Sequence, residues 1–234
     1  ELAHDVWHEL RSRPQLHVAG VFSHFADSEY RHRTFTRLQL DRFAHVTRLA
    51  PTGALRHIAC TAAALRYPES RGALIRLGLG LYGLWPSPQT HVAARRRTPG
   101  LTLTPALTWK TSVLQMKNVP RGTPIGYGLT VRTTRATRVG VLPVGYWDGL
   151  DRGLSNRGAV IIHGRKARIL GRVCMNLTMV DCTDIPSAHA GDVVTLIGHQ
   201  GRGAVTADDH ALWAKTINYE IVTRIADHVP RVAM

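Results

Sequence analysis

The sequence predicts two domains of different class, an α/β domain over residues 1–100 and an all-β domain over residues 101–234. The first hundred residues alternate apolar runs of strand length with helix-like stretches, an order typical of consecutive βα units with parallel strands. After residue 100, strand-length pieces rich in Thr, Val and Gly follow one another between turn residues, as in β-barrels and sandwiches. A length of 234 residues is sufficient for two hydrophobic cores.

Three short segments predict the strands of the first domain, at residues 18–22, 55–59 and 73–75. The near-continuous apolar run at 18–22 is typical of a buried strand in a parallel sheet. Apolar residues spaced along 35–46 predict the helix between the first two strands, and Thr61 is the expected N-cap of an alanine-rich helix after the second. Three strands cannot close a (β/α)8 barrel, so we expect an incomplete α/β unit.

The second domain is predicted from six strand-length pieces and one late helix. Turn residues such as the Pro-Arg-Gly of 120–122 separate the pieces. The helix is expected from about residue 206 to 217, with Thr206 as N-cap and with Asp208 and Asp209 in the first turn, where carboxylates are favourable. The predicted strands are residues 107–113, 139–143, 159–163, 167–171, 179–182 and 193–198.

The chain is strongly basic, with a formal net charge of +14. Of its 30 basic residues four are lysine and the other 26 are arginine, scattered among acidic and apolar neighbours except at Arg95-Arg96-Arg97. A nucleic-acid-binding protein usually gathers such charge into a patch or tail, so we interpret the excess mainly as a solvated surface that attracts anionic ligands. An RNA-binding β-barrel protein is the alternative from another functional class.

Cysteine usage and hydropathy narrow the class of protein further. Three cysteines without a C-x-x-C spacing favour neither a disulfide framework nor a metal site, and a reducing, cytoplasmic setting fits them best. The mean hydropathy of -0.10 is that of a globular protein, and no apolar run approaches the roughly 18 to 20 residues of a membrane span. We therefore expect neither a bound metal nor a membrane partner.

Polar and cationic groups follow the three predicted strands of the first domain. In parallel α/β folds, ligands bind at the carboxyl ends of the strands, and the groups found there are His24, His57, Thr61 and Arg76. Thr61 supplies a hydroxyl at a helix start, and Gly78 leaves nearby backbone N–H groups unhindered, so this rim can hold a phosphate. The alternative interpretation is that the histidines are structural and that the glycines after Arg76 form a plain tight turn.

In the second domain, glycines flank two tyrosines. Tyr127 lies between Gly126 and Gly128, and Tyr146 lies in a Gly-Tyr-Trp-Asp-Gly segment. Flanking glycines let the backbone bend sharply and present a side chain, although an exposed turn is the alternative interpretation. Cys174 could act as a nucleophile, but no partner base is identifiable, so a buried small residue is the favoured interpretation.

Eight segments give a more specific signature together than any motif gives alone. They are VFSHFA at 21–26, HIACTAA at 57–63, IRLGLGLYGL at 75–84, GYG at 126–128, PVGYWDG at 143–149, GRVCM at 171–175, TINYE at 216–220 and VPR at 229–231. In this order they resemble bacterial alanine racemases, the fold-type III pyridoxal-phosphate enzymes. The resemblance runs from about residue 15 to the end of the printed sequence.

The resemblance implies a (β/α)8 barrel followed by a β-domain. Residues 1–100 would then form the C-terminal part of the barrel, and residues 101–234 the β-barrel-like domain. It also implies pyridoxal 5'-phosphate as cofactor and a racemase that converts L-alanine to D-alanine for peptidoglycan precursors. The implied partners are a small amino-acid substrate and a second copy of the chain, in a homodimer with shared active sites, with no nucleic acid.

The resemblance also implies roles for residues around the cofactor ring. Tyr127 would be the acid/base for one face of the substrate, and His24 would contact it. Arg76 would donate a hydrogen bond to the pyridine nitrogen, and His57 would orient Arg76. Because arginine keeps its proton, the ring nitrogen would stay unprotonated, which weakens the electron sink and discourages side reactions such as transamination.

Other positions correspond to the phosphate and substrate contacts of the family. Thr61 stands where serine is usual and keeps the hydroxyl. Cys60 stands where asparagine is frequent, and Asn176 stands where aspartate is usual, so a carboxylate is lost near the site and substrate range is affected. The implied phosphate positions are Thr61, Gly78, Leu79 and Tyr219, and the implied substrate positions are Met175 and Tyr146.

One family motif has no counterpart in the printed sequence. The Lys-Ala-x-Ala-Tyr-Gly-His-Gly-like string that carries the cofactor lysine does not occur, and all four lysines lie beyond residue 100. We therefore expect a truncated chain that is inactive alone, because the covalent attachment of the cofactor and the base for the second substrate face are both missing. A catalytically dead relative and a fragment of a broad-specificity amino-acid racemase are the alternatives.

Overall fold

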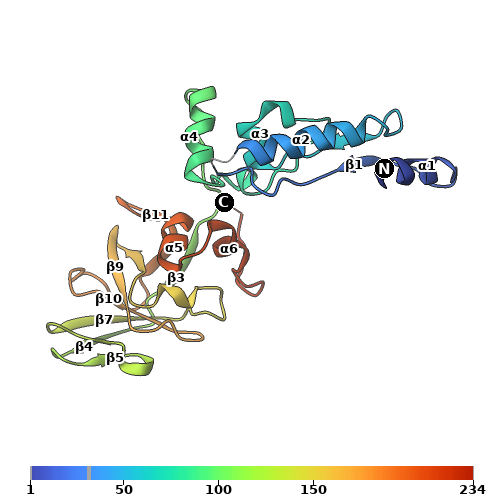
Figure 1. The fold of residues 1–234 in the computed structure, drawn as a ribbon. Helices are drawn as coiled ribbons and strands as arrows, with labels where there is room; N and C mark the ends of the chain where they lie inside the picture. Colours follow the sequence, from blue (N-terminus) through green and yellow to red (C-terminus); the bar gives the residue numbers. More distant parts are fainter. Residues whose placement is uncertain (1, 31–32, 234) are drawn as a thin grey trace. The chain divides into compact units, whose positions relative to one another are not determined.

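The computed structural model describes residues 2–30 and 33–233, and the chain folds as two compact units, residues 1–106 and 107–234 (Figure 1). The first unit has an α/β composition, and the second is mainly an antiparallel β-sheet. Among the described residues, no helix combines the length and the apolar character required to cross a membrane.

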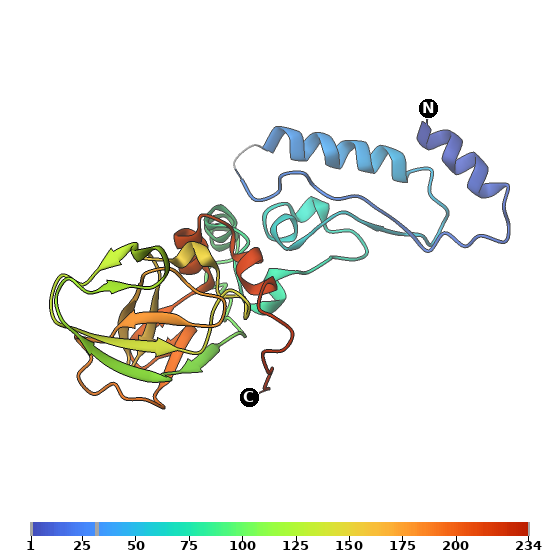
Figure 2. The ribbon, with the colours of Figure 1, turned by 90° about the horizontal axis from the view of Figure 1, so that it is seen from below.

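The first unit is built around a two-stranded parallel sheet. Gly20 pairs with Leu55 and Phe22 pairs with His57, which confirms the predicted parallel βα order for the first two strands. Helix α2 runs alongside the extended segment that contains β1 (Figures 1 and 2). The elements are α1 Leu2–Arg11, β1 Gly20–Phe22, α2 Arg33–Thr47, β2 Leu55–His57, α3 Thr61–Arg66, η1 Pro68–Ser70, η2 Leu79–Tyr82 and α4 Pro88–Arg97.

The predicted third strand at residues 73–75 is wrong. The backbone there makes only an isolated parallel bridge between Cys60 and Arg76, with hydrogen bonds from the N–H of Ala73 to Arg56 and from that of Arg76 to Ala59. A strand needs a continuous ladder along its length, and these bonds do not provide one. The segment reaches the same edge as β2 without regular strand structure.

The expected burial of the first strand is also wrong. Phe22 is 69% exposed and Leu55 is 44% exposed, although both lie in the paired strands. The core of this unit lies instead between the strand ends and α3, as a small cluster. Its buried members are Phe25, Ile58, Ala59, Ala63, Ala64 and Tyr67.

The predicted N-cap of the alanine-rich helix is displaced by one residue. Cys60 is the N-cap of α3, and Thr61 is the first helical residue. The Thr61 hydroxyl is used in a tertiary contact, because it accepts a hydrogen bond from the N–H of Gly78 at 3.0 Å. The sequence could not distinguish the two uses of this hydroxyl.

The second unit contains an eight-stranded sheet in the order β12-β11-β8-β9-β10-β7-β4, with β3 paired to β11. Each of the six predicted pieces overlaps a strand of this sheet. The additional strands β4, β5, β6 and β12 were not predicted. The strands are β3 Trp109–Ser112, β4 Gln115–Val119, β5 Pro124–Ile125, β6 Val131–Arg132, β7 Thr137–Leu142, β8 Ala159–Ile162, β9 Arg165–Leu170, β10 Thr178–Asp181, β11 Val193–Gln200 and β12 Gly203–Val205.

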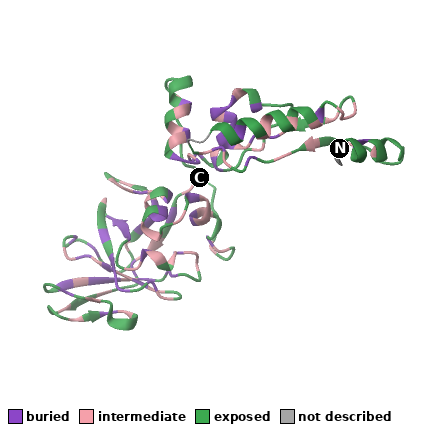
Figure 3. Ribbon diagram, viewed as in Figure 1, coloured by how far each residue is buried: buried purple, intermediate pink, exposed green. Residues whose placement is uncertain are grey.

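The core of the second unit lies on the central strands of this sheet. Every residue of β8 is buried, and Ile161, Ile162 and Leu196 are among the largest fully buried side chains. In Figure 3, buried residues (purple) recur along the strands of the second unit. The apolar sequence Ala-Val-Ile-Ile of β8 matches this position, since β-branched residues pack well on a pleated sheet. Short turns at η3 Tyr127–Leu129 and η4 Arg152–Leu154 connect the strands.

Two helices complete the second unit, where one late helix was predicted. Helix α5 Ala207–Ala214 begins at the predicted N-cap, where Thr206 and Asp209 form a reciprocal capping box. The helix was expected to continue to residue 217 but ends at Lys215, whose φ of 60° lies in the left-handed region. Helix α6 Asn218–Thr223 follows and packs against α5.

Candidate functional site

In the first unit, Arg76 gathers the two predicted histidines. One guanidinium nitrogen, Nη2, donates to the carbonyl of Ser23 at 2.7 Å and lies 3.3 Å from Nδ1 of His24. The other, Nη1, forms a hydrogen bond with Nδ1 of His57 and lies 3.3 Å from the His57 carbonyl. Two histidine rings and backbone carbonyls thus hold the guanidinium, and no ion pair between Arg76 and a carboxylate occurs among the described residues.

Phe22 completes this arrangement from β1. Its ring stacks on His57 with centroids 5.7 Å apart, and the Arg76 guanidinium carbon lies 5.5 Å from the Phe22 centroid. The guanidinium therefore lies beside an aromatic face, a geometry that adds a cation–π attraction. We refer to His24, His57 and Arg76, with Phe22, as the Arg76 cluster.

Thr61 lies against the glycine segment that follows Arg76. Besides the hydrogen bond from Gly78, its methyl group approaches Gly80 so closely that a Cβ there would lie 2.5 Å from Cγ2 of Thr61. A Cβ on Gly78, in contrast, would meet no atom within 4 Å. Leu79 is buried between these glycines. The first unit thus brings Thr61 together with Gly78 and Leu79. Gly78 lies two residues after Arg76 in sequence, and the space beside its Cα is open.

In the second unit, Tyr127 projects from a sharply bent loop. Gly126 and Gly128 both have φ of 72°, a conformation that favours glycine, and Tyr127 is 73% exposed. The loop rests on the segment after β9: a Cβ on Gly171 would lie 2.6 Å from the Ile125 carbonyl. This geometry agrees both with a tyrosine presented by its flanking glycines and with a plain exposed turn.

Tyr146 and Met175 are joined through their backbones. The N–H of Tyr146 donates to Cys174 at 3.0 Å, and that of Trp147 donates to Met175 at 2.8 Å. Gly145 permits this approach, because a Cβ there would lie 2.2 Å from the Cys174 carbonyl. Both side chains are exposed. Consequently Met175 lies within segment 171–175, and the loops of Tyr127 and Tyr146 both contact that segment.

Two supports of the Tyr146 loop were not identified from the sequence. Asp148 accepts a hydrogen bond from the N–H of Gly145 at 2.8 Å, and its other oxygen lies 2.9 Å from Nε2 of His228. The His228 ring stacks on Trp147. The Asp in the Gly-Tyr-Trp-Asp-Gly segment was an available signal, since Asp commonly hydrogen-bonds the backbone of its own turn, but His228 is 80 residues away in sequence.

Tyr219 and Cys174 are the remaining candidate residues of the second unit. Tyr219 lies half-buried in α6, in the second unit. Cys174 is half-buried, and burial raises the pKa of its thiol more than the charge of Arg152 lowers it. A raised pKa decreases the thiolate fraction, which argues against a nucleophilic role for this cysteine.

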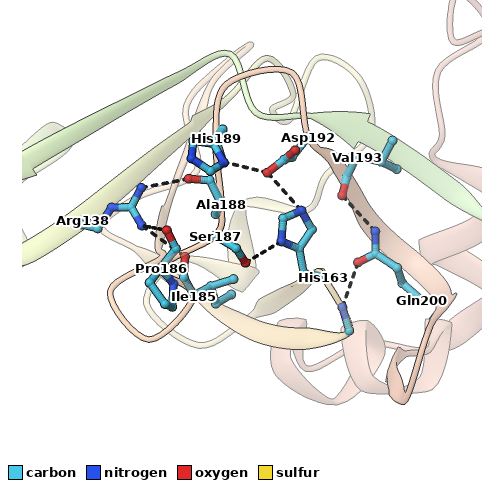
Figure 4. Close-up of polar contacts among 11 residues, drawn as sticks. Arg138, His163, Ile185, Pro186, Ser187, Ala188, His189, Asp192, Val193 and Gln200 are labelled. Carbon is cyan, nitrogen blue, oxygen red and sulfur yellow. Dashed lines mark hydrogen bonds and ion pairs between the residues drawn. The ribbon is translucent and has the colours of Figure 1, made fainter.

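A further polar group at the end of the β-sheet was not anticipated (Figure 4). His163, in the turn between β8 and β9, contacts Ser187 Oγ and Asp192 Oδ2, each at 3.0 Å. The backbone N–H of His189, and then His163, lower the pKa of Asp192. Arg138 donates to the carbonyls of Ile185, Pro186 and Ala188 in the same loop. These contacts fasten the loop between β10 and β11, and we assign them a structural role.

Comparisons with known proteins match both units. The family model described as the N-terminal domain of alanine racemase matches residues 1–86, and the model of the C-terminal domain matches residues 106–233. An alanine racemase from Leptospira interrogans is 39% identical over 224 residues, covering 93% of this chain and 57% of the relative. One from Halothermothrix orenii is 41% identical over 227 residues, covering 95% of this chain and 58% of the relative.

Solved structures give the same result. The crystal structure of alanine racemase from Streptomyces lavendulae has a TM-score of 0.86 and 38% identity, covering 97% of this chain and 61% of that protein. That of Bartonella henselae, with covalently bound pyridoxal phosphate, has a TM-score of 0.83 and 26% identity, covering 98% and 60%.

The chain thus spans about 57–61% of the length of these relatives. Two family models in sequence order, relatives at about 40% identity and similar solved folds all agree. They also confirm the resemblance that the eight sequence segments predicted. On these grounds, this chain belongs to the alanine racemase family.

Proposed function

We propose that this chain provides the C-terminal part of a pyridoxal-phosphate-dependent alanine racemase. The single observation that carries the proposal is the Arg76 cluster, in which an uncompensated guanidinium is fixed at the ends of two parallel strands by His24, His57 and backbone carbonyls. The first unit then corresponds to part of a (β/α)8 barrel. The relatives are longer, and the proposal requires the cofactor lysine to come from a segment beyond the 234 printed residues.

The residues of the first unit fit the cofactor. Arg76 keeps its proton at any physiological pH, so it can donate to a pyridine nitrogen but cannot protonate it. Thr61 offers a hydroxyl, and the open space before Gly78 leaves room for a phosphate beside Leu79. In the proposal Tyr219 adds a further phosphate contact. When bound, the cofactor supplies an electron-withdrawing ring that acidifies the α-hydrogen of an amino acid.

The residues of the second unit would act on the substrate. Tyr127 is the proposed acid/base that takes or gives the α-proton on one face, while Tyr146 and Met175 contact the substrate. An unperturbed tyrosine is a weak base at neutral pH, and in the proposal His24 contacts the Tyr127 hydroxyl. All three side chains are exposed on one unit, which supports their insertion into the active site of a partner subunit. The proposed assembly is a homodimer.

The test uses a hybrid in which the amino-terminal part of the Halothermothrix orenii relative precedes residue 1. The hybrid should exchange the α-hydrogen of both L- and D-alanine in deuterated water, as measured by NMR. Tyr127→Phe should abolish exchange from one enantiomer and preserve it for the other, because only one face loses its base. Tyr30→Phe, which changes another exposed tyrosine, is the matched control. Equal loss for both enantiomers would contradict the two-base scheme.

A second variant tests the role of Arg76 separately. Arg76→Glu places a carboxylate where the guanidinium lies, which favours a protonated pyridine nitrogen and should increase pyruvate formation through transamination. Arg76→Lys keeps the charge and serves as the control. Unchanged pyruvate formation in Arg76→Glu would contradict the proposed hydrogen bond between Arg76 and the pyridine nitrogen.

A further inference from the structure

The first unit contains a second cationic site, separate from the Arg76 cluster. A cavity of about 450 Å³ is lined by four arginines from three helices. Arg33 begins α2, Arg66 ends α3, and Arg96 and Arg97 end α4. The apolar side of the cavity is formed by Pro88 and Val92, together with Ala93. None of the lining residues is acidic, and none belongs to the Arg76 cluster.

Arg66 is the central residue of this cavity. It is only 6% exposed, its Nη1 donates to the carbonyl of Ser28 at 2.8 Å, and its guanidinium carbon lies 5.4 Å from the Tyr67 ring centroid. Its Nε–H has no hydrogen-bond partner among the described residues, and neither has the buried Oε1 of Gln89, which also lines the cavity. A buried charge without a counter-charge is costly, as is a buried donor without an acceptor. An anion in the cavity would relieve both costs.

We propose that this cavity binds a small phosphate-bearing anion, such as a diphosphate or a phosphate ester. The planar guanidinium groups of Arg33, Arg66, Arg96 and Arg97 match phosphate oxygens, which they bind through paired hydrogen bonds. The volume lies within the usual range of small-ligand sites and exceeds what one phosphate occupies. Pro88 and Val92 would contact the carbon part of an ester, and Gln89 would accept a hydrogen bond from a hydroxyl.

The geometry favours a small ligand over RNA. Arg66 is almost completely buried, so an extended polynucleotide backbone lying on the surface would not reach it. The consecutive arginines at the end of α4 also differ, because Arg96 and Arg97 line the cavity whereas Arg95 does not. Arg95 therefore provides a matched control with the same charge on the same helix turn.

The test measures binding of inorganic diphosphate to the chain by isothermal titration calorimetry at about physiological salt. We expect one saturable site. Arg96→Gln combined with Arg97→Gln should weaken binding by about tenfold or more, since charge-assisted hydrogen bonds are lost. Arg66→Lys, which keeps the buried charge but loses the planar fork, should also weaken it, whereas Arg95→Gln should change affinity less than about twofold. Circular dichroism checks that each variant is folded. A phosphate monoester that binds more tightly than inorganic phosphate would identify an ester as the ligand.

Several outcomes would overturn the proposal. Absence of saturable binding would do so directly, and equal loss in Arg95→Gln would show general attraction to a basic surface. Loss of binding in Arg76→Ala, with Arg96→Gln and Arg97→Gln unaffected, would assign the diphosphate to the Arg76 cluster. Binding of a single-stranded RNA oligonucleotide that diphosphate fails to displace would favour the nucleic-acid alternative. Because racemase activity is not measured, failure here leaves the proposed function untouched.

Discussion

The two units bury their apolar residues to very different degrees. Among the described residues, the largest fully buried side chains all belong to the second unit except Ile58. Strand β8 is buried along its whole length, whereas β1 and β2 expose Phe22 and Leu55. In sequence β1 (Gly-Val-Phe) and β8 (Ala-Val-Ile-Ile) are both apolar, whereas β2 is Leu-Arg-His. The difference shows that apolar composition gives a segment the capacity to be buried, and that neighbouring strands decide whether it is.

The two units therefore contribute different features to the molecule. The second unit has the larger core, and its exposed candidates Tyr127 and Tyr146 lie on loops whose backbones contact segment 171–175, which carries Met175. The first unit has a small core but carries both cationic sites, the Arg76 cluster and the arginine-lined cavity. Stability and ligand chemistry can therefore be perturbed separately.

The largest effect should come from the core of the second unit. Leu196→Ala removes a fully buried side chain from β11 and should lower the free energy of unfolding by about 2 to 5 kcal/mol. Leu55→Ala, at a 44% exposed position in the first unit, should change it by less than about 0.5 kcal/mol. Urea denaturation followed by circular dichroism measures both. Similar losses of unfolding free energy in the two variants would contradict the conclusion that the second unit is more tightly packed than the first.

A second effect should appear at mildly acidic pH. Burial lowers the pKa of His210 in α5 to about 4, from the ordinary histidine value of 6.5, against the opposing effect of the Leu196 carbonyl. Above pH 6.5 both the folded and unfolded states are neutral at this residue. Between pH 6.5 and 4 only the unfolded state takes up the proton, so stability should fall with pH by about 2 to 3 kcal/mol over this window. Chemical denaturation of wild type across this range should show the loss.

Variants of two histidines test whether His210 causes this pH dependence. His210→Gln should flatten the pH profile, because the group that titrates differently in the two states has been removed. His199→Gln, at an exposed histidine of β11, should leave the profile unchanged. An unaltered slope in His210→Gln would show that another group causes the acid sensitivity.

The next effect concerns the packing of the first unit. Gly80→Ala would place a Cβ 2.5 Å from Cγ2 of Thr61 and should destabilise the unit by about 1 to 3 kcal/mol. Thr61→Ser removes that methyl group, so the double variant should regain most of the loss. Thermal denaturation of the single and double variants measures the coupling. Additive losses would mean that the methyl contact does not determine the cost.

The smallest effect is expected at the start of α5. Thr206→Ala removes the hydroxyl that accepts the N–H of Asp209 at 3.0 Å and should cost about 1 kcal/mol. Thr134→Ala, at an exposed threonine in the same unit, should be close to neutral. Urea midpoints compare the two. An undetectable change in Thr206→Ala would indicate that tertiary packing alone defines the helix start.

The features that the sequence determined by itself are local or are repeated in many places. Alternating apolar runs and turns predicted six strands of the second unit, and the spacing of Thr206 and Asp209 placed a helix start. Eight ordered segments indicated the family, which the comparisons confirm. In each case the signal lies within a few adjacent residues, or accumulates over many short segments, so it does not depend on knowing which segments meet in space.

Only the tertiary structure decided which groups meet. The same hydroxyl of Thr61 could cap a helix or accept the N–H of Gly78, and the fold selects the second. It also reduces the predicted strand 73–75 to one bridge, brings His228 to Asp148, and encloses Arg66 with arginines from two other helices. Hydrogen bonds and burial depend on distances between segments far apart in sequence, and those distances exist only once the whole unit has packed.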